Sequence, residues 1–364
     1  MDFLAGPNSM RRLLQTLRLT PCARVVPRFI EPFLAQARIH LKTGDFALLE
    51  SQLAQLPAES YEHFVWRLAD DRQTPGWLKT WSRAMPQSPH PALLSAYVDI
   101  SNAWKVRGET YARDIPFLRR RRFPKIMNQA YEKFLGIIET DPGNPMALAG
   151  LIHCNVVIGA GDGHRDQWMH AAMLAQPFHC PVIVQYARGT YARWGGEVDE
   201  HYQFAAWVME NAPAGSCSLV IAAQAVLDDA LSASEEIDDI RQIAQHLRDE
   251  DAAAWLRQAI LKWAGATPET LQRRIGSIIA THGDDYHVVC LESFALAAYF
   301  CGATNEARLL FTALRGRLQA EFWEYYVPPL PIWMHMIRSG SRGMCRVHDQ
   351  VCRDLGLDPR QVCQ

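Results

Sequence analysis

Residues 126–142 read IMNQAYEKFLGIIETDP, and this stretch decides the fold. Apolar residues recur in it at spacings of three and four, the period of an amphipathic helix, and a proline ends the run. The same spacing recurs in residues 165–175, 198–210, 252–264 and 286–300, whereas alternating stretches bounded by turn residues are scarce. These patterns predict an all-α chain.

A repeat is indicated by the prolines that follow these helical patterns. Pro142, Pro177 and Pro213 lie 35 and 36 residues apart, close to the period of about 34 residues of tetratricopeptide (TPR) helix pairs. Ala130 and Phe134 keep the Ala-x-x-x-Phe register of the second TPR helix before Pro142. A later turn glycine with the same alanine and phenylalanine is found at Gly302, Ala307 and Phe311. We therefore predict degenerate TPR-like repeats in an α-solenoid-like arrangement.

Composition narrows the class of protein. The chain has 364 residues, 49% of them hydrophobic, which is enough for a sizeable core. Lys and Arg number 37 against 39 Asp and Glu, a formal net charge of -2 that argues against a globally basic nucleic-acid binder. The nine cysteines are odd in number and include no Cys-x-x-Cys pair, so free thiols in a reducing compartment are favoured. No run of 18 apolar residues occurs, and early charges interrupt any signal sequence. We expect a cytoplasmic protein with no membrane segment.

Two charged segments interrupt the repeat. Residues 104–125 carry eight basic and two acidic side chains, with Pro116 and Pro124 as expected helix breakers. Residues 228–251 carry nine acidic and two basic side chains. The expected organisation is therefore an N-terminal helical region (1–103), a basic insertion or joint (104–125), a TPR-like repeat core (126–232) and a C-terminal helical region (233–364).

Residues 193–205 read RWGGEVDEHYQFA. This stretch resembles the signature of a bacterial domain-of-unknown-function family built of TPR-like helix pairs, in which Trp-Gly-Gly is followed by acidic residues and then Phe-Ala. The resemblance extends over residues 164–229, and it departs from the family at Ala192 and Glu197. It implies the helical fold and, because the family has no established activity, no chemistry.

The same residues predict a turn between two helices. Gly195 and Gly196 allow the positive φ that ends a helix, and Trp194 is expected to pack over the turn. The acidic residues Glu197, Asp199 and Glu200 are expected to open the next helix, where they oppose its positive N-terminal dipole. A ligand contact by Trp194 is the alternative.

A search for catalytic or metal-binding motifs gives little. The glycines after Val156-Val157-Ile158 imitate a dinucleotide loop, but the sixth position is His164, so the fingerprint fails. Cys345, His348 and Cys352 share a helix face, yet the outer two lie about 10 Å apart along the axis, too far for one tetrahedral zinc. We therefore expect no metal and no cofactor.

Two adjacent pairs leave one catalytic possibility open. His153-Cys154 and His179-Cys180 point about 100° apart within each pair, so neither forms a nucleophile and base by itself. A pairing between the two elements stays open. No nucleophile elbow, zinc-protease motif or phosphate loop is present, and the chain is not expected to be an enzyme.

Three surfaces are candidates for partner binding. The run Arg119–Arg122 favours a solvated surface or an acidic protein partner over phosphates, so nucleic acid is not the expected partner. The aromatic segment is typical of a binding hot spot, although capping of the last repeat is the alternative; it comprises Phe322, Trp323, Tyr325, Tyr326 and Trp333. The acidic block is a candidate face for a basic partner, with a solvated helix as the alternative; it comprises Asp228, Asp229, Glu235, Glu236, Asp238, Asp239, Asp249, Glu250 and Asp251.

The expected function is therefore protein binding by a non-catalytic helical repeat, which offers an extended surface. Its sharper form is a bacterial immunity protein that neutralises a co-produced toxin, such as a nuclease effector of a secretion system, by using acidic residues that mimic nucleic acid. An adaptor in a multiprotein assembly is the first alternative. An enzyme with a dispersed site in the helical groove is the alternative from another class.

Overall fold

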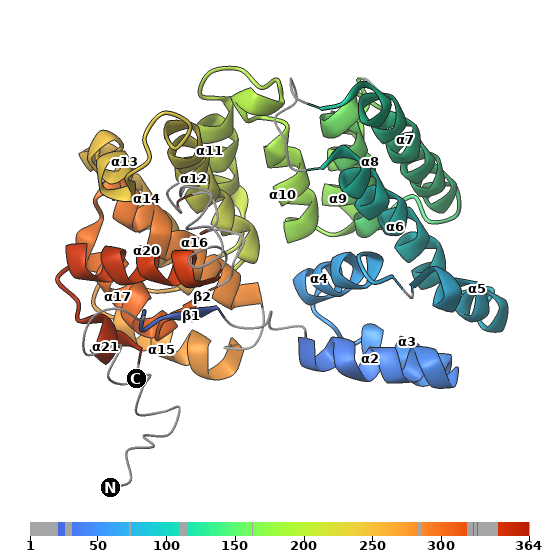
Figure 1. The fold of residues 1–364 in the computed structure, drawn as a ribbon, viewed down its shortest axis with the longest axis horizontal. Helices are drawn as coiled ribbons and strands as arrows, with labels where there is room; N and C mark the ends of the chain where they lie inside the picture. Colours follow the sequence, from blue (N-terminus) through green and yellow to red (C-terminus); the bar gives the residue numbers. More distant parts are fainter. Residues whose placement is uncertain are drawn as a thin grey trace, which may run out of the picture. The chain divides into compact units, whose positions relative to one another are not determined.

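The computed structural model describes residues 21–25, 31–72, 74–108, 115–161, 163–282, 286–318 and 341–363, together with Trp323 and Tyr326. The chain divides into two compact units. The N-terminal unit is Phe29–Ala212, coloured blue to green in Figure 1, and the C-terminal unit combines Met1–Arg28 with Pro213–Gln364. The boundary at Ala212 falls inside the range 126–232 that the sequence had suggested as one repeat core.

The described part of the N-terminal unit consists mainly of helices. They are α2 (Glu31–Thr43), α3 (Phe46–Leu53), α4 (Ala58–Ala69), α5 (Thr74–Ala84), α6 (Pro89–Arg107), α7 (Phe117–Thr140), α8 (Pro145–Ile158), α9 (Arg165–Ala175), α10 (Cys180–Arg188), the 3-10 turn η2 (Ala192–Trp194) and α11 (Glu200–Asn211). Local sequence sets several of these limits. The Asn144 side chain accepts a hydrogen bond from the Ala147 N–H (3.0 Å), and Pro145 opens α8 behind that cap.

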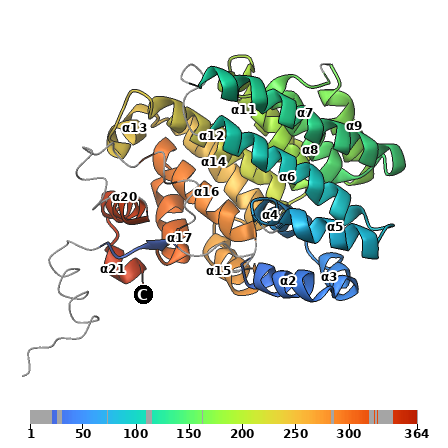
Figure 2. The ribbon, with the colours of Figure 1, turned by 45° about the vertical axis from the view of Figure 1, so that its right-hand side comes forward.

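From α6 to α11, each helix of this unit packs against the helix that precedes or follows it in the chain, and Figures 1 and 2 show these neighbours. Helix α7 contacts α6 and α8, α9 contacts α8 and α10, and α10 contacts α11. Four helices also contact one another in a ring, α4 with α6, α6 with α8, α8 with α10 and α10 with α4. We call α4, α6, α8 and α10 the central layer.

Close packing between α7 and α8 follows from the two residues that suggested a repeat. Ala130 and Phe134 are both fully buried. The Phe134 ring meets the Tyr97 ring edge to face at 5.2 Å and fills the space beside Gly150, where any Cβ would overlap it. The small alanine and the large phenylalanine of the Ala-x-x-x-Phe register therefore both lie in the packed core of the unit.

The basic segment is structured differently from the expectation. Helix α6 continues to Arg107, and α7 begins at Phe117 and runs through Pro124, so the run Arg119–Arg122 lies exposed on the first turns of a long helix. The prediction that Pro124 breaks the helix is wrong: α7 continues through it, at the cost of the one backbone hydrogen bond that a proline cannot donate. Val156 to Ile158 form the end of α8 and no strand.

The C-terminal unit is built around one buried helix, α16 (Tyr286–Cys301), in which every residue except His287 is buried. A helix that is apolar on all sides must be covered on all sides. It contacts α12 (Ile221–Ala233), α13 (Ile240–His246), α14 (Glu250–Ala264), α15 (Leu271–His282), α17 (Thr304–Leu314) and the 3-10 turn η3 (Cys217–Val220).

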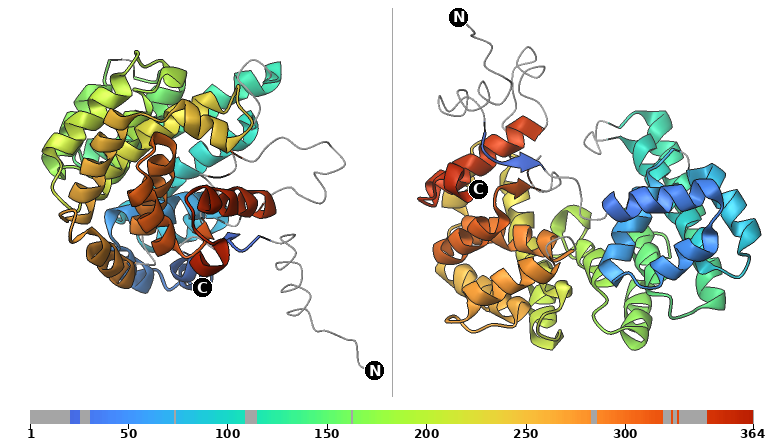
Figure 3. Two further views of the ribbon diagram at one scale, coloured as in Figure 1. Left: turned by 90° about the vertical axis from the view of Figure 1, so that its left-hand side faces the viewer. Right: turned by 90° about the horizontal axis from the view of Figure 1, so that it is seen from below.

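Two short strands close this unit. The strand β1 (Arg24–Val25) pairs in parallel with β2 (Arg317–Leu318), and both lie near α20 (Ser341–Asp354) and α21 (Pro359–Val362) in Figure 3. Apart from this pair, the regular elements of the described residues are helices, so the prediction of an all-α chain is confirmed. The predicted ranges 165–175 and 286–300 match α9 and α16 to within one residue.

Candidate functional site

A buried polar network joins helices of the central layer. It is formed by Glu62 of α4, Trp104 of α6, His153 of α8, and Gln185 and Arg188 of α10. The Trp104 Nε1 donates to His153 Nε2 over 3.3 Å, and His153 Nδ1 lies 2.9 Å from Gln185 Oε1. Exposed fractions of 8% for Glu62, 2% for His153 and 5% for Gln185 place the network inside the unit.

The Trp104 contact selects one neutral tautomer of His153. Because an indole N–H only donates, the Nε2 facing Trp104 must be the acceptor, and Nδ1–H then donates to the Gln185 amide oxygen. The Arg188 Nη1 lies 3.0 Å from Nδ1 and is itself a donor, so it forms no hydrogen bond with this tautomer. Burial and the positive charge of Arg188 together lower the pKa of His153 to about 3, although the hydrogen bond with Gln185 raises it. His153 is therefore a neutral connector between two helices.

The pKa of Glu62 shifts in the direction that also favours the neutral form, but upward. Burial raises its pKa to about 7, even though a hydrogen bond from Trp66, the positive charge of Arg188 and a hydrogen bond from Gln185 each lower it. Desolvation therefore outweighs three stabilising partners. The carboxyl exchanges its proton near neutral pH, a property typical of functional sites.

Three partly exposed tryptophans surround His153 and its partners. The Trp66 and Trp104 rings meet the His153 ring edge to face at 5.7 and 6.2 Å, and Trp194 meets Trp104 at 6.3 Å. The Arg107 guanidinium lies 5.4 Å from the centre of the Trp104 ring. We call Trp66, Trp104 and Trp194 the tryptophan cluster. Tryptophan and arginine are the residue types that dominate binding hot spots.

Sequence analysis named His153 and Trp194 separately but did not predict that they belong to one site. Glu62, His153 and Gln185 lie on three helices, and neither helical period nor motif spacing connects them. A search for polar residues on apolar helix faces would have selected His153, which is flanked in α8 by buried apolar residues.

The Cys–His possibility finds no activated thiol at Cys154. Burial raises the Cys154 pKa, and its sulfur lies 3.8 Å from the Met127 carbonyl oxygen as a donor. Burial lowers the pKa of His179 to about 4. Thiolate chemistry at Cys154 is therefore strongly disfavoured at neutral pH.

Cys345, His348 and Cys352 pack in the C-terminal unit. All three are buried, the Cys352 sulfur lies 3.8 Å from the His348 ring nitrogens, and the His348 ring contacts Phe311 and Trp323 edge to face. Within the described ranges, no group of three His, Cys, Asp or Glu side chains is arranged to hold a metal ion.

The acidic block is divided by the fold. Asp228 is buried with 6% exposure, so its assignment to a partner-binding face is wrong, and Asp229 is half-buried. Asp239 caps α13 by accepting from the Arg241 N–H at 2.8 Å, and Asp249 caps α14 by accepting from the Ala252 N–H at 2.7 Å. Five residues of the block are exposed without a capping hydrogen bond, namely Glu235, Glu236, Asp238, Glu250 and Asp251.

The aromatic segment lies partly in the core. Trp323 is 0% and Tyr326 5% exposed, so both are wrong as exposed hot-spot residues, and the capping alternative fits them. The Trp323 indole donates to Glu292 Oε1 over 2.6 Å. Phe322, Tyr325 and Trp333 lie outside the described residues.

The Trp-Gly-Gly turn has the predicted glycine conformation at one position. Gly195 adopts a positive φ of 93°, which favours glycine. At Gly196 a side chain is excluded by close packing instead, because any Cβ there would overlap the Thr190 backbone. Glu200 alone of the three acidic residues lies in the first turn of α11, and its side chain accepts from the Glu197 N–H at 2.9 Å. Asp199 precedes the helix with φ 63, so its predicted place inside the helix is wrong.

Replacing Gly196 by alanine is expected to lower the free energy of unfolding by about 2–4 kcal/mol, because the added methyl group overlaps backbone atoms that cannot yield cheaply. The matched control is Gly136→Ala in α7, where a Cβ meets nothing within 4 Å and alanine is expected to add about 0.5–1 kcal/mol. Urea denaturation measures the free energy of unfolding of both variants. Equal changes in this free energy for Gly196→Ala and Gly136→Ala would show that the turn is not close-packed.

Comparisons with known proteins give no relative: no family model, no curated protein and no solved structure matches this chain. The resemblance to the Trp-Gly-Gly family therefore stays a prediction. Among the helices that the structure describes, none is long and apolar enough to cross a membrane.

Proposed function

We propose that this chain is a non-catalytic helical-repeat protein that binds a protein partner through the tryptophan cluster. The observation that carries the proposal is the position of Trp66, Trp104 and Trp194, partly exposed, beside Arg107 and on or next to the helices of the central layer. Rigid aromatic side chains that are already held by neighbours lose little entropy on binding.

A TPR-like arrangement of the N-terminal unit supports this proposal. Pro142, Pro177 and Pro213 each follow the end of α7, α9 or α11 by two residues. Helices α7 and α9 each contact the helix before and the helix after, while α6, α8 and α10 contact one another in succession. This alternation is typical of stacked helix pairs, which present one layer of helices to ligands.

The sharper form of the proposal is a cytoplasmic immunity protein that neutralises a co-produced toxin, with a nuclease as the favoured class. The exposed acids Glu235, Glu236, Asp238, Glu250 and Asp251 support a basic partner, since they provide an electrostatic face that mimics nucleic acid. The nine free cysteines fit a reducing compartment. An adaptor in a multiprotein assembly is the alternative within the same class.

The alternative from another class is an enzyme with a dispersed site at the polar network. Its specific support is Glu62, whose raised pKa of about 7 suits a general acid or base. Protein binding is preferred because Glu62 is 8% exposed whereas the tryptophans around the network are accessible.

The test is affinity capture from the native cell with wild-type protein, Trp194→Ala and Trp207→Ala as baits. Trp207 is an exposed tryptophan (40%) of the same unit that lies outside the cluster. A partner that wild type and Trp207→Ala retain and Trp194→Ala loses supports the proposal. A partner held equally by all three places the interface elsewhere, and a partner encoded beside this chain and toxic alone favours immunity.

Reversing three exposed acids, Glu235, Glu236 and Asp238, to lysine is expected to slow association with that partner severalfold at low salt while the dissociation rate changes little. Asp239 is left unchanged because it caps α13. The matched control reverses Glu132 and Glu139, two exposed acids of α7. Surface plasmon resonance measures both rates, and equal association rates for the two variants would remove the acidic face from the interface.

A further inference from the structure

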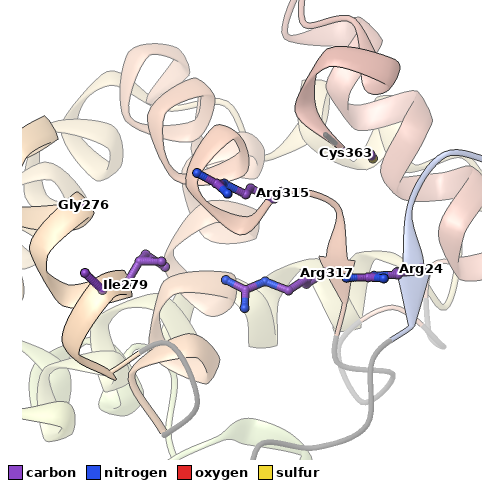
Figure 4. A pocket seen from close by; sticks show the side chains of 7 residues that line it. Arg24, Gly276, Ile279, Arg315, Arg317 and Cys363 are labelled. Carbon is purple, nitrogen blue, oxygen red and sulfur yellow. The ribbon is translucent and has the colours of Figure 1, made fainter.

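A basic pocket lies within the C-terminal unit. It has a volume of about 500 Å³ and is lined by Arg24, Arg315, Arg317, Ile279, Ala280 and Cys363, with Gly276 beside them. This volume falls in the range of about 300–1,000 Å³ that small-molecule sites occupy. Figure 4 shows Arg315 and Arg317 extending toward the helix that carries Gly276 and Ile279.

Four separate parts of the sequence build this pocket, namely β1, α15, the end of α17 with β2, and the C-terminal Cys363. The parallel pairing of β1 with β2 places Arg24 directly opposite Arg317. Side chains at paired positions of neighbouring strands lie on one face, so these two guanidiniums share a wall of the pocket, as Figure 4 shows. Arg315 comes two residues earlier, just after α17, and adopts the left-handed conformation with φ 51.

The described residues that line the pocket include three arginines and no acidic side chain. In the described part of the chain, neither Arg24, Arg315 nor Arg317 forms an ion pair with a carboxylate, and the hydrogen bond of Arg317 goes to the Leu314 carbonyl oxygen at 3.3 Å. Like charges at paired strand positions repel each other, so an anion between the guanidiniums relieves a repulsion that the protein carries alone.

The wall of the pocket that faces the arginines is apolar. Ile279 and Ala280 of α15 contribute apolar side chains, and Gly276 leaves open space where a Cβ would be. A ligand that fills the pocket therefore needs a compact anionic group at one end and an apolar body at the other. A phosphate monoester carries about two negative charges, and its oxygens accept hydrogen bonds from the paired N–H donors of guanidiniums. A single carboxylate carries only one negative charge and therefore neutralises the arginines less fully.

We propose that the pocket lined by Arg24, Arg315 and Arg317 binds a small organic phosphate, with the phosphate group on the arginines and the organic group against Ile279 and Ala280. Binding at this site is independent of the protein partner proposed above, because the pocket includes neither the tryptophan cluster nor the exposed acidic residues.

Isothermal titration of the full chain tests the proposal with phenyl phosphate, inorganic phosphate and neutral benzyl alcohol at constant ionic strength. Phenyl phosphate is expected to bind, inorganic phosphate to bind at least about fivefold more weakly because it leaves the apolar wall empty, and benzyl alcohol not to bind. A phosphate monoester is also found in the headgroup of phosphatidic acid. Sedimentation of the protein with phosphatidic acid vesicles distinguishes binding to such a lipid from binding to a soluble ligand. Binding to vesicles alone would overturn the proposal of a soluble ligand.

Arg317→Gln and Arg24→Gln are each expected to weaken phenyl phosphate binding about tenfold or more, since each removes a charge-assisted bond. Arg248→Gln, an exposed arginine of the same unit outside the pocket, is expected to bind within about twofold of wild type. Melting temperatures without ligand show whether the variants fold, and removal of a repelling charge is expected to leave them unchanged or raised. No binding of phenyl phosphate by wild type at about 10 mM, or equal binding by all variants, would overturn the proposal.

Discussion

Replacing Trp323 by alanine is expected to lower the free energy of unfolding by about 4 kcal/mol, within the range for deleting a large buried aromatic side chain. The side chain is fully buried, it packs edge to face on Phe311 and His348, and its indole donates to the buried carboxylate of Glu292 at 2.6 Å. Alanine removes the packing and also takes a donor from Glu292, so two costs add.

Guanidinium denaturation followed by circular dichroism measures this change. Trp323→Phe keeps most of the ring and loses only the indole N–H, so a loss of about 2 kcal/mol is expected. Trp207→Ala, on a tryptophan that is 40% exposed, is the control and is expected to cost about 1 kcal/mol or less. Similar losses for Trp323→Ala and Trp207→Ala would show that Trp323 is not part of the core.

Glu62→Gln is expected to raise the free energy of unfolding by about 2–3 kcal/mol at pH 8 and to change it little at pH 4. The raised pKa of about 7, against 4.5 for the ordinary carboxyl, means that the folded state holds a proton that the unfolded state has released. Stability from this group is fully present below about pH 4.5 and is lost as the pH rises through 7, where the buried carboxylate must form. Glutamine stays neutral and avoids this loss.

Urea denaturation at a series of pH values from 4 to 8 gives the difference between Glu62→Gln and wild type. Glu139→Gln, on an exposed glutamate of α7 that does not act on Glu62, is the control and is expected to differ from wild type by less than about 0.5 kcal/mol throughout. His153 contributes the opposite slope, because its lowered pKa of about 3 makes its stability present above about pH 6.5 and lost as the pH falls. This term cancels in the comparison. A difference that does not grow with pH would contradict the burial of an ionisable Glu62.

Helical periodicity predicted what depends on local sequence. The ranges around Ala130, Phe134, Ala307 and Phe311 are helices, and these four side chains are fully buried, because apolar spacing specifies which face is covered. The acidic block was less predictable from a charge count. Such a count ignores N-caps, although Asp249 before the helical run Glu250–Ala264 fits the cap rule and identifies a structural role.

The polar network and the arginine pocket depend on tertiary packing, which the sequence patterns did not predict. Glu62, His153 and Gln185 meet only because α10 contacts both α4 and α8 in the central layer. Arg24 and Arg317 meet through a strand pair of two residues each, too short to produce an alternating pattern. Neither arrangement follows from the composition or spacing of one segment.

The most direct measurement of the central claim is the dissociation constant of the captured partner for wild type, Trp194→Ala and Trp207→Ala. If the tryptophan cluster is the binding surface, Trp194→Ala should weaken binding at least about 30-fold, the 2 kcal/mol of a hot-spot residue, and Trp207→Ala less than about threefold. Circular dichroism of each variant confirms that the helices are intact. Equal dissociation constants for Trp194→Ala and Trp207→Ala would contradict binding through the tryptophan cluster.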